Sequence, residues 1–130
     1  MAYRPESLQW SYDKQLARLD PENVMIKFES SKSSLPACEW ACRALASITL
    51  CAAEKHDMDL QCRLLDLGIC ENLIDALSVH GAESSIVAAY GCQTLRNLAF
   101  DSRDFREFLG TLSLLFLPLL LFSFRIHFLR

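Results

Sequence analysis

Apolar residues along this chain recur at intervals of three and four positions, the spacing that places side chains on one face of an α-helix. Leu73, Ile74 and Leu77 show this spacing within residues 69–80. A second stripe follows Ser84 and consists of Val87, Gly91, Leu95 and Leu98. No segment alternates apolar and polar residues with a period of two, so no strand is expected. The pattern therefore predicts an all-α protein.

Capping residues and glycines predict where the individual helices begin and end. Asp20 before Pro21, and Ser34 before Pro36, are the residue types preferred at helix N-termini. Gly68 can adopt the left-handed conformation that ends many helices. We expect helices that begin near residues 21 and 36, cover 60–67 and 69–80, begin again at 85, and finish with a short one over 103–109. Residues 1–19 are compatible with a further helix that docks on those that follow.

The first half of the chain is loosely repeated in the second half. EWACRALASI (39–48) and AYGCQTLRNL (89–98) align at a spacing of 50 residues. The stop glycines of RLLDLG (63–68) and FREFLG (105–110) are only 42 residues apart. An insertion of about eight residues, the length of the charged connection AAEKHDMD (52–59), accounts for the difference between the two spacings.

The stretch GICENLIDALSVHGAESSIVAAYGCQTLRNLA (68–99) resembles an armadillo repeat. It has the Gly-Ile start, an L-x-x-x-L second helix, and a third helix of the form V-x-x-x-G-x-x-x-L-x-N-L-A. This resemblance implies a right-handed α-solenoid in which Ala41 and Gly91 allow close helix crossings. The expected organisation is an N-terminal helical segment (1–19), a degenerate repeat (20–67), a second repeat (68–110) and a hydrophobic tail (111–130).

The armadillo resemblance also implies protein binding through the face that successive third helices form. In peptide-binding members, the Asn of the L-x-N-L motif hydrogen-bonds the ligand backbone; Asn97 matches it, and Ser47 stands at the same place in the looser copy. Gln93 and Arg43 replace the Trp of nuclear-import receptors, so that activity is not assigned. The expected partner-binding groove suits an acidic or polar peptide in a scaffold or adaptor, and is lined by Arg43, Ser47, Gln93, Arg96 and Asn97.

The six cysteines do not form the pattern of a chemical site. They are Cys38, Cys42, Cys51, Cys62, Cys70 and Cys92. The chain contains no C-x-x-C pair and its histidines are scattered, so the spacing of a zinc site is absent and neither a metal nor a cofactor is expected. No Gly-rich elbow accompanies any Cys and His, so no enzyme is expected. Packed, reduced thiols are the favoured interpretation.

The charge distribution argues against nucleic-acid binding, and the start of the chain indicates the cytoplasm. All sixteen acidic residues precede residue 108, and Arg125 and Arg130 are the only basic residues after it. The preceding part is therefore mildly acidic, without a basic patch that would indicate nucleic-acid binding. MAYRPESLQW lacks the features of a signal or transit peptide, so the cytoplasm is the expected location.

The uncharged segment 108–124, FLGTLSLLFLPLLLFSF, leaves three alternatives open. The first is a C-terminal membrane anchor, although the segment reaches only roughly 25 Å at about 1.5 Å per residue and Pro118 interrupts it. The second is an apolar helix buried against a partner or a second copy of the chain. The third is that the chain is the product of a shortened armadillo gene, with translation running past the repeat into unrelated codons. The alternative function is accordingly a small tail-anchored membrane protein with a helical cytosolic stalk.

Overall fold

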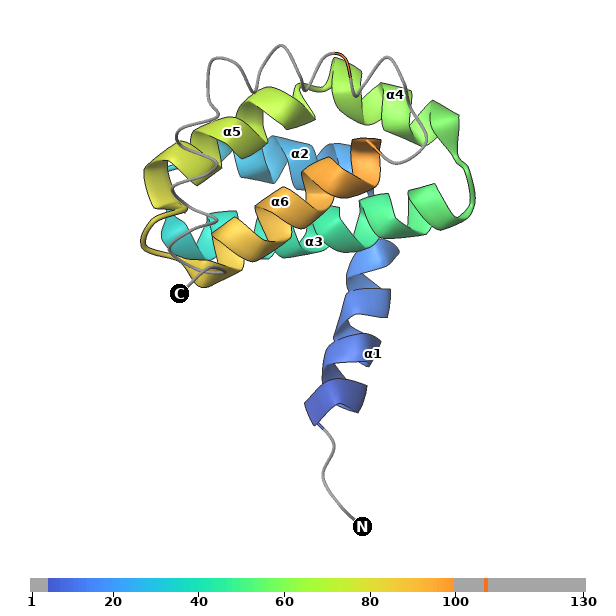
Figure 1. Ribbon diagram of the computed structural model, residues 1–130, viewed down its shortest axis with the longest axis horizontal. Helices are drawn as coiled ribbons and strands as arrows, with labels where there is room; N and C mark the ends of the chain where they lie inside the picture. The colour runs from blue at the N-terminus through green and yellow to red at the C-terminus, as the bar shows by residue number, and fades with distance from the viewer. Residues whose placement is uncertain (1–4, 100–106, 108–130) are drawn as a thin grey trace.

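The computed structural model of the chain describes residues 5–99 and residue 107, and every regular element in that part is an α-helix (Figure 1). The prediction of an all-α protein is confirmed for these residues. The helices are α1 (Pro5–Ala17), α2 (Pro21–Ser30), α3 (Leu35–Glu54), α4 (Met58–Asp66), α5 (Ile69–His80) and α6 (Ser85–Ala99). The short helix expected over 103–109, apart from Glu107, and the segment 108–124 lie outside the described residues.

The helix boundaries follow the capping residues that the sequence contains. The Asp20 carboxylate accepts the Glu22 N–H at 3.2 Å, and the Ser34 hydroxyl accepts the Ala37 N–H at 3.4 Å. Gly68 has φ 83°, the left-handed conformation predicted for it. The fourth helix begins at Met58, earlier than the predicted 60, because Asp57 caps it by accepting the Leu60 N–H at 3.1 Å.

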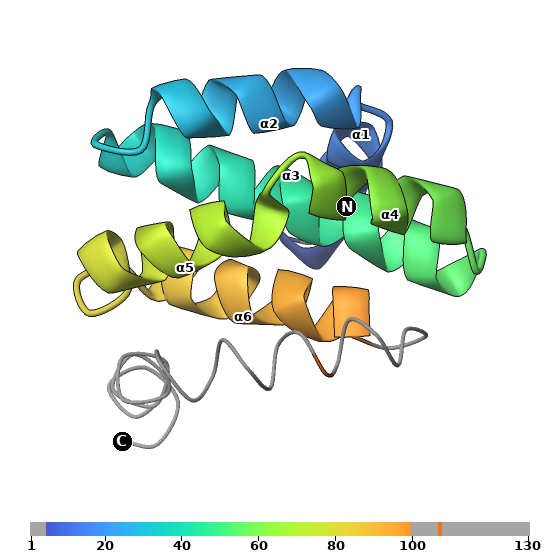
Figure 2. The same cartoon turned by 90° about the horizontal axis from the view of Figure 1, so that it is seen from above.

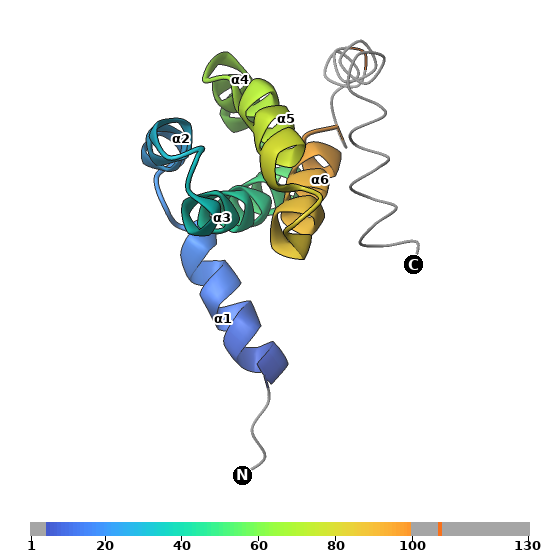
Figure 3. The ribbon, with the colours of Figure 1, turned by 90° about the vertical axis from the view of Figure 1, so that its left-hand side faces the viewer.

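Helices α3 and α6 lie side by side and run in the same direction, while α2 and α5 run opposite to them in a second row (Figure 2). The end-on view shows the two rows, with α1 leaving α3 on the side away from α2 (Figure 3). The helices therefore form two antiparallel pairs, α2 with α3 and α5 with α6, which pack on each other mainly through α3 and α6. Each pair contains one copy of the sequence repeat.

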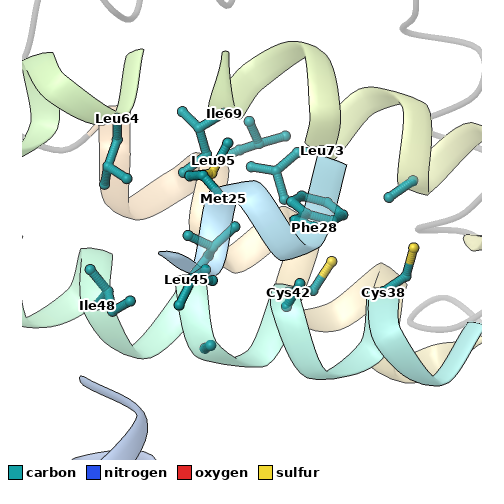
Figure 4. Close-up of a cluster of buried hydrophobic side chains, with 14 of the residues drawn as sticks. Met25, Phe28, Cys38, Cys42, Leu45, Ile48, Leu64, Ile69, Leu73 and Leu95 are labelled. Carbon is teal, nitrogen blue, oxygen red and sulfur yellow. The ribbon is translucent and has the colours of Figure 1, made fainter. Parts of the chain in front are cut away.

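The core lies between the two rows and is built from equivalent positions of the repeat (Figure 4). Leu45 and Leu95, which align in the sequence, are both buried there. Phe28 and Leu77 align at a spacing of 49 residues, and both side chains are at most 2% exposed. Phe28 and Leu45 are among the largest fully buried side chains of the protein. The periodic stripes of the sequence are therefore the stripes that face the core.

Gly91 allows α5 to approach α6 closely. A Cβ atom added to Gly91 would lie 3.1 Å from Leu77 Cδ2, closer than ordinary van der Waals contact. Ala41, the equivalent residue of the first copy, is fully buried in α3. The predicted close crossing is confirmed at Gly91, where glycine in mid-helix costs about 1 kcal/mol relative to alanine.

Polar contacts also tie the first helix pair to the second. The Lys32 ammonium lies 3.2 Å from the Asp75 carboxylate, and the Lys32 carbonyl oxygen lies 2.9 Å from His80 Nε2. The Ser84 hydroxyl donates to the Glu39 carboxylate at 2.9 Å. These contacts join residues more than 40 positions apart, so each pair depends on the other for part of its polar satisfaction.

No helix within residues 5–99 combines the length and the apolar character needed to cross a lipid bilayer.

Candidate functional site

Two adjacent pockets lie along the seam between α3 and α6. The first has a volume of about 300 Å³ and the second of about 420 Å³. Leu50 and Glu54 of α3 line both, so the two pockets are neighbours along α3, and we call them together the α3–α6 groove. The described lining of the first also includes Asp13, Lys14, Ala17, Ala46, Ser47, Cys51, Tyr90 and Gln93, and that of the second Ala53, Arg96 and Asn97.

Four of the five predicted site residues meet at this groove. Ser47 and Gln93 lie at the first pocket, and Arg96 and Asn97 at the second. They come from two helices that the chain order separates by about fifty residues, and the parallel packing of α3 and α6 brings them together. Arg96 is exposed and Ser47 and Gln93 are half-buried, so these three side chains are accessible to a ligand.

The side-chain amide of Asn97 is used inside the protein. Asn97 is 5% exposed, and its Nδ2 donates to the Ala46 carbonyl at 3.1 Å and to Thr49 Oγ1 at 3.2 Å. Thr49 in turn donates to the Leu45 carbonyl at 2.7 Å. These bonds satisfy the buried amide N–H groups and join α6 to α3. A hydrogen bond from this amide to a ligand backbone, as the armadillo resemblance implies, stays a prediction.

Arg43 belongs to the contact between α1 and α3. Its guanidinium lies 4.4 Å from the centre of the Tyr12 ring and 5.7 Å from that of Tyr90, and its Nε donates to Asp13 Oδ1 at 3.1 Å. The Arg43 and Asp13 side chains are 27% and 34% exposed. Each of these interactions contributes about 0.5–1 kcal/mol when partly solvated. Arg43 is absent from the described lining of both pockets, unlike the other predicted residues.

The charge of the groove is mixed. Asp13 and Glu54 contribute carboxylates, and Lys14 and Arg96 contribute cations. The expected preference for an acidic peptide rested on Arg43 and Arg96, and Arg43 is already paired with Asp13. Arg96 is therefore the predicted arginine that stands at the groove itself.

Sequence reasoning missed the groove residues contributed by the end of α3 and by α1. Leu50 and Glu54 follow Ser47 by three and seven residues, so their position on the same helix face was readable from helical spacing. Asp13, Lys14 and Ala17 carried no comparable signal, because the docking angle of α1 on α3 is fixed by tertiary packing.

Five of the six cysteines are at least partly buried, as predicted for packed thiols. Cys38, Cys42 and Cys70 are buried. Burial raises the pKa of Cys42 and of Cys70 to about 12, and the nearby Cys38, Cys92 and Glu39 add to the effect at Cys42. The prediction is wrong for Cys62, which is exposed on α4.

Within residues 5–99 and residue 107, no cluster of three or more His, Cys, Asp or Glu side chains has the arrangement needed to hold a metal ion.

Comparison of the chain with models of protein families, with curated proteins and with solved structures found no match.

Proposed function

We propose that this chain is a non-enzymatic protein-interaction module, a scaffold or adaptor that binds an extended peptide or a partner helix along the α3–α6 groove. The observation that carries the proposal is the adjacency of two pockets that share Leu50 and Glu54 in their lining. The described lining of the two pockets combines apolar side chains with charged and hydrogen-bonding ones, which suits a ligand that carries both kinds of group.

The two helix pairs support an armadillo-like interpretation of the architecture. In that interpretation α3 and α6 are successive third helices, and their parallel arrangement follows from the repeat. The aligned residues Leu45 and Leu95 are buried in both copies. The right-handed solenoid and the membership of residues 20–67 and 68–110 in two such repeats are part of this proposal.

The side chains of the groove define the ligand chemistry. Leu50 is 41% exposed between the two pockets and offers an apolar anchor point. Arg96 and Glu54 flank that point with opposite charges, while Ser47 and Gln93 offer hydrogen-bonding groups. The proposed ligand is a polar peptide with one apolar side chain over Leu50 and a carboxylate directed to Arg96.

Selection of peptides from a displayed random library against the full chain tests this function. We expect ligands that lose at least tenfold in affinity on Leu50→Asp and on Arg96→Glu. Val79→Asp is the matched control, because Val79 is 64% exposed on α5 and absent from the described lining of the groove. Ligands that bind all variants equally, or that depend on Val79 instead, contradict the proposal.

The cytoplasm is the proposed location, and a tail-anchored membrane protein is the alternative. The uncharged run of residues 108–124 favours the alternative, and it lies outside the described residues. Carbonate extraction of cell membranes separates the two: an anchor leaves the chain in the membrane pellet, whereas a cytoplasmic interaction module is recovered in the supernatant or in aggregates.

A further inference from the structure

Helix α1 covers one end of the α3–α6 groove. It packs on α3 and supplies Asp13, Lys14 and Ala17 to the first pocket. Figure 1 shows that the rest of α1 projects away from the other helices. A helix of 13 residues is marginal on its own in water, so its docking on α3 is what holds it.

The contact that α1 makes has a defined chemistry. From α1, consecutive residues Tyr12 and Asp13 present an aromatic ring and a carboxylate. The receiving surface consists of Arg43 on α3 and Tyr90 on α6, whose ring also lies near the guanidinium, 5.7 Å away. We call Arg43 and Tyr90 the aromatic–arginine seat. A planar guanidinium can stack on a ring and bind a carboxylate at the same time, which suits this pair of side chains.

The contacts that α1 makes with the aromatic–arginine seat are partly open to solvent. Tyr12 is 39% exposed, and the Arg43–Asp13 ion pair is partly open to solvent. Among the described side chains of α1, Leu16 is the one that is buried. Contacts of this kind are weak individually, so a ligand presenting the same groups competes with them.

We propose that the aromatic–arginine seat recognises an aromatic residue followed directly by an acidic one, and that α1 occupies the seat in cis through Tyr12 and Asp13. A partner segment with this dipeptide displaces α1 and continues into the pocket beside Ser47 and Gln93. This inference rests on the proposed function, since the aromatic–arginine seat adjoins the first pocket of the groove through Asp13 and Tyr90, and the inference names the partner class. The acidic residue of the partner segment pairs with Arg43 in place of Asp13.

Fluorescence anisotropy with a labelled peptide of residues 5–19, PESLQWSYDKQLARL, tests the exchange on the full chain. We expect the peptide to bind Asp13→Lys protein about two- to fivefold more tightly than wild-type protein, because the cis ion pair is lost while the seat is intact. A peptide with the same Asp13→Lys change loses that gain. Equal affinity of the two peptides, or of the two proteins, overturns the inference.

A charge-reversal variant distinguishes a change in the seat from a loss of folding. Arg43→Glu in the protein, with Asp13 retained, abolishes binding of the original peptide and allows the Asp13→Lys peptide to bind, which a misfolded variant cannot do. Failure of this rescue overturns the inference.

The two proposals fail separately. If library-selected ligands depend on Leu50 but are not displaced by the 5–19 peptide, the groove function stands and the seat is wrong. If the 5–19 peptide exchanges as described while no ligand depends on Leu50, the seat stands and the proposed function of the groove is wrong.

Discussion

Asn97 of α6 donates its side-chain amide to the backbone carbonyl of Ala46 in α3, 51 positions earlier in the chain. The L-x-N-L motif that suggested a ligand-binding amide thus supplies a hydrogen bond between the two helix pairs. The same residue also lines the second pocket.

Asn97→Ala is expected to lower the free energy of unfolding by about 1–3 kcal/mol, because it removes two buried hydrogen bonds. Gln93→Ala on the same helix is the control and should change stability by less than about 0.5 kcal/mol, since Gln93 is half-buried at the pocket rim. Urea denaturation followed by circular dichroism measures both. Loss of ligand binding in Asn97→Ala at unchanged stability would support the predicted ligand-binding role of Asn97.

Gly91→Val should destabilise the protein by about 2 kcal/mol or more, because its side chain would collide with Leu77. Shortening that neighbour should relieve the collision. We therefore expect Leu77→Ala to cost less in the Gly91→Val background than in the wild type, where it creates a cavity. Thermal unfolding of the four proteins of this double-mutant cycle gives the coupling; additive effects would mean that Gly91 does not set the helix approach.

Gln61→Leu should stabilise the protein by about 1–2 kcal/mol. Gln61 is 2% exposed on α4, and neither polar atom of its amide has a hydrogen-bond partner among the residues that the structure describes. An apolar side chain of similar size removes the cost of burying them. Gln61→Glu places a charge at the same point and should destabilise instead. The order of the midpoints in urea, Leu above wild type above Glu, checks the prediction, and a Leu variant below the wild type would refute it.

Alkylation at pH 8 should modify Cys62 rapidly and leave Cys42 and Cys70 unmodified while the protein is folded. The thiolate is the reactive form, and a pKa of about 12 leaves roughly one thiolate in ten thousand at Cys42 or Cys70 at that pH. Cys62 is exposed. Mass spectrometry of proteolytic fragments after timed exposure to iodoacetamide compares the sites. Labelling of Cys42 as fast as that of Cys62 would contradict the packing described for α3.

The buried thiol of Cys42 should make stability fall at alkaline pH. Its pKa rises from 9.0 to about 12 on folding, so the unfolded chain loses this proton first. The contribution is complete below pH 9 and declines between pH 9 and 12, by up to about 1.4 kcal/mol per pH unit. Cys42→Ala should have a shallower decline across that range in urea melts. Parallel curves for the two proteins would rule out the assignment.

The sequence predicted the helices because their signals are local. Asp20 and Ser34 cap the helices they were expected to cap, and Gly68 has the expected conformation. The aligned core residues were also predictable, because helical spacing identifies the buried face. Of the groove, the sequence located Ser47, Gln93, Arg96 and Asn97.

What escaped prediction depends on contacts between distant segments. A motif places Asn97 on a helix face, but the direction of its amide depends on Thr49 and Ala46 across the seam. Arg43 lies on the predicted face, yet the docking of α1 gives it Asp13 as a partner. Cys62 shares its residue type with the buried thiols, and only the orientation of α4 exposes it.

The contacts between the helix pairs also bear on how this protein reaches its folded state. Glu22 meets Arg63, Lys32 meets Asp75, and Asn97 meets Ala46, each across a separation of 41 to 51 residues. A nascent chain therefore completes α2 and α3 well before their counterparts have been synthesised. During that interval the inner face of α3 has no α6 to cover it, so its apolar side chains are exposed to other chains with which they can aggregate.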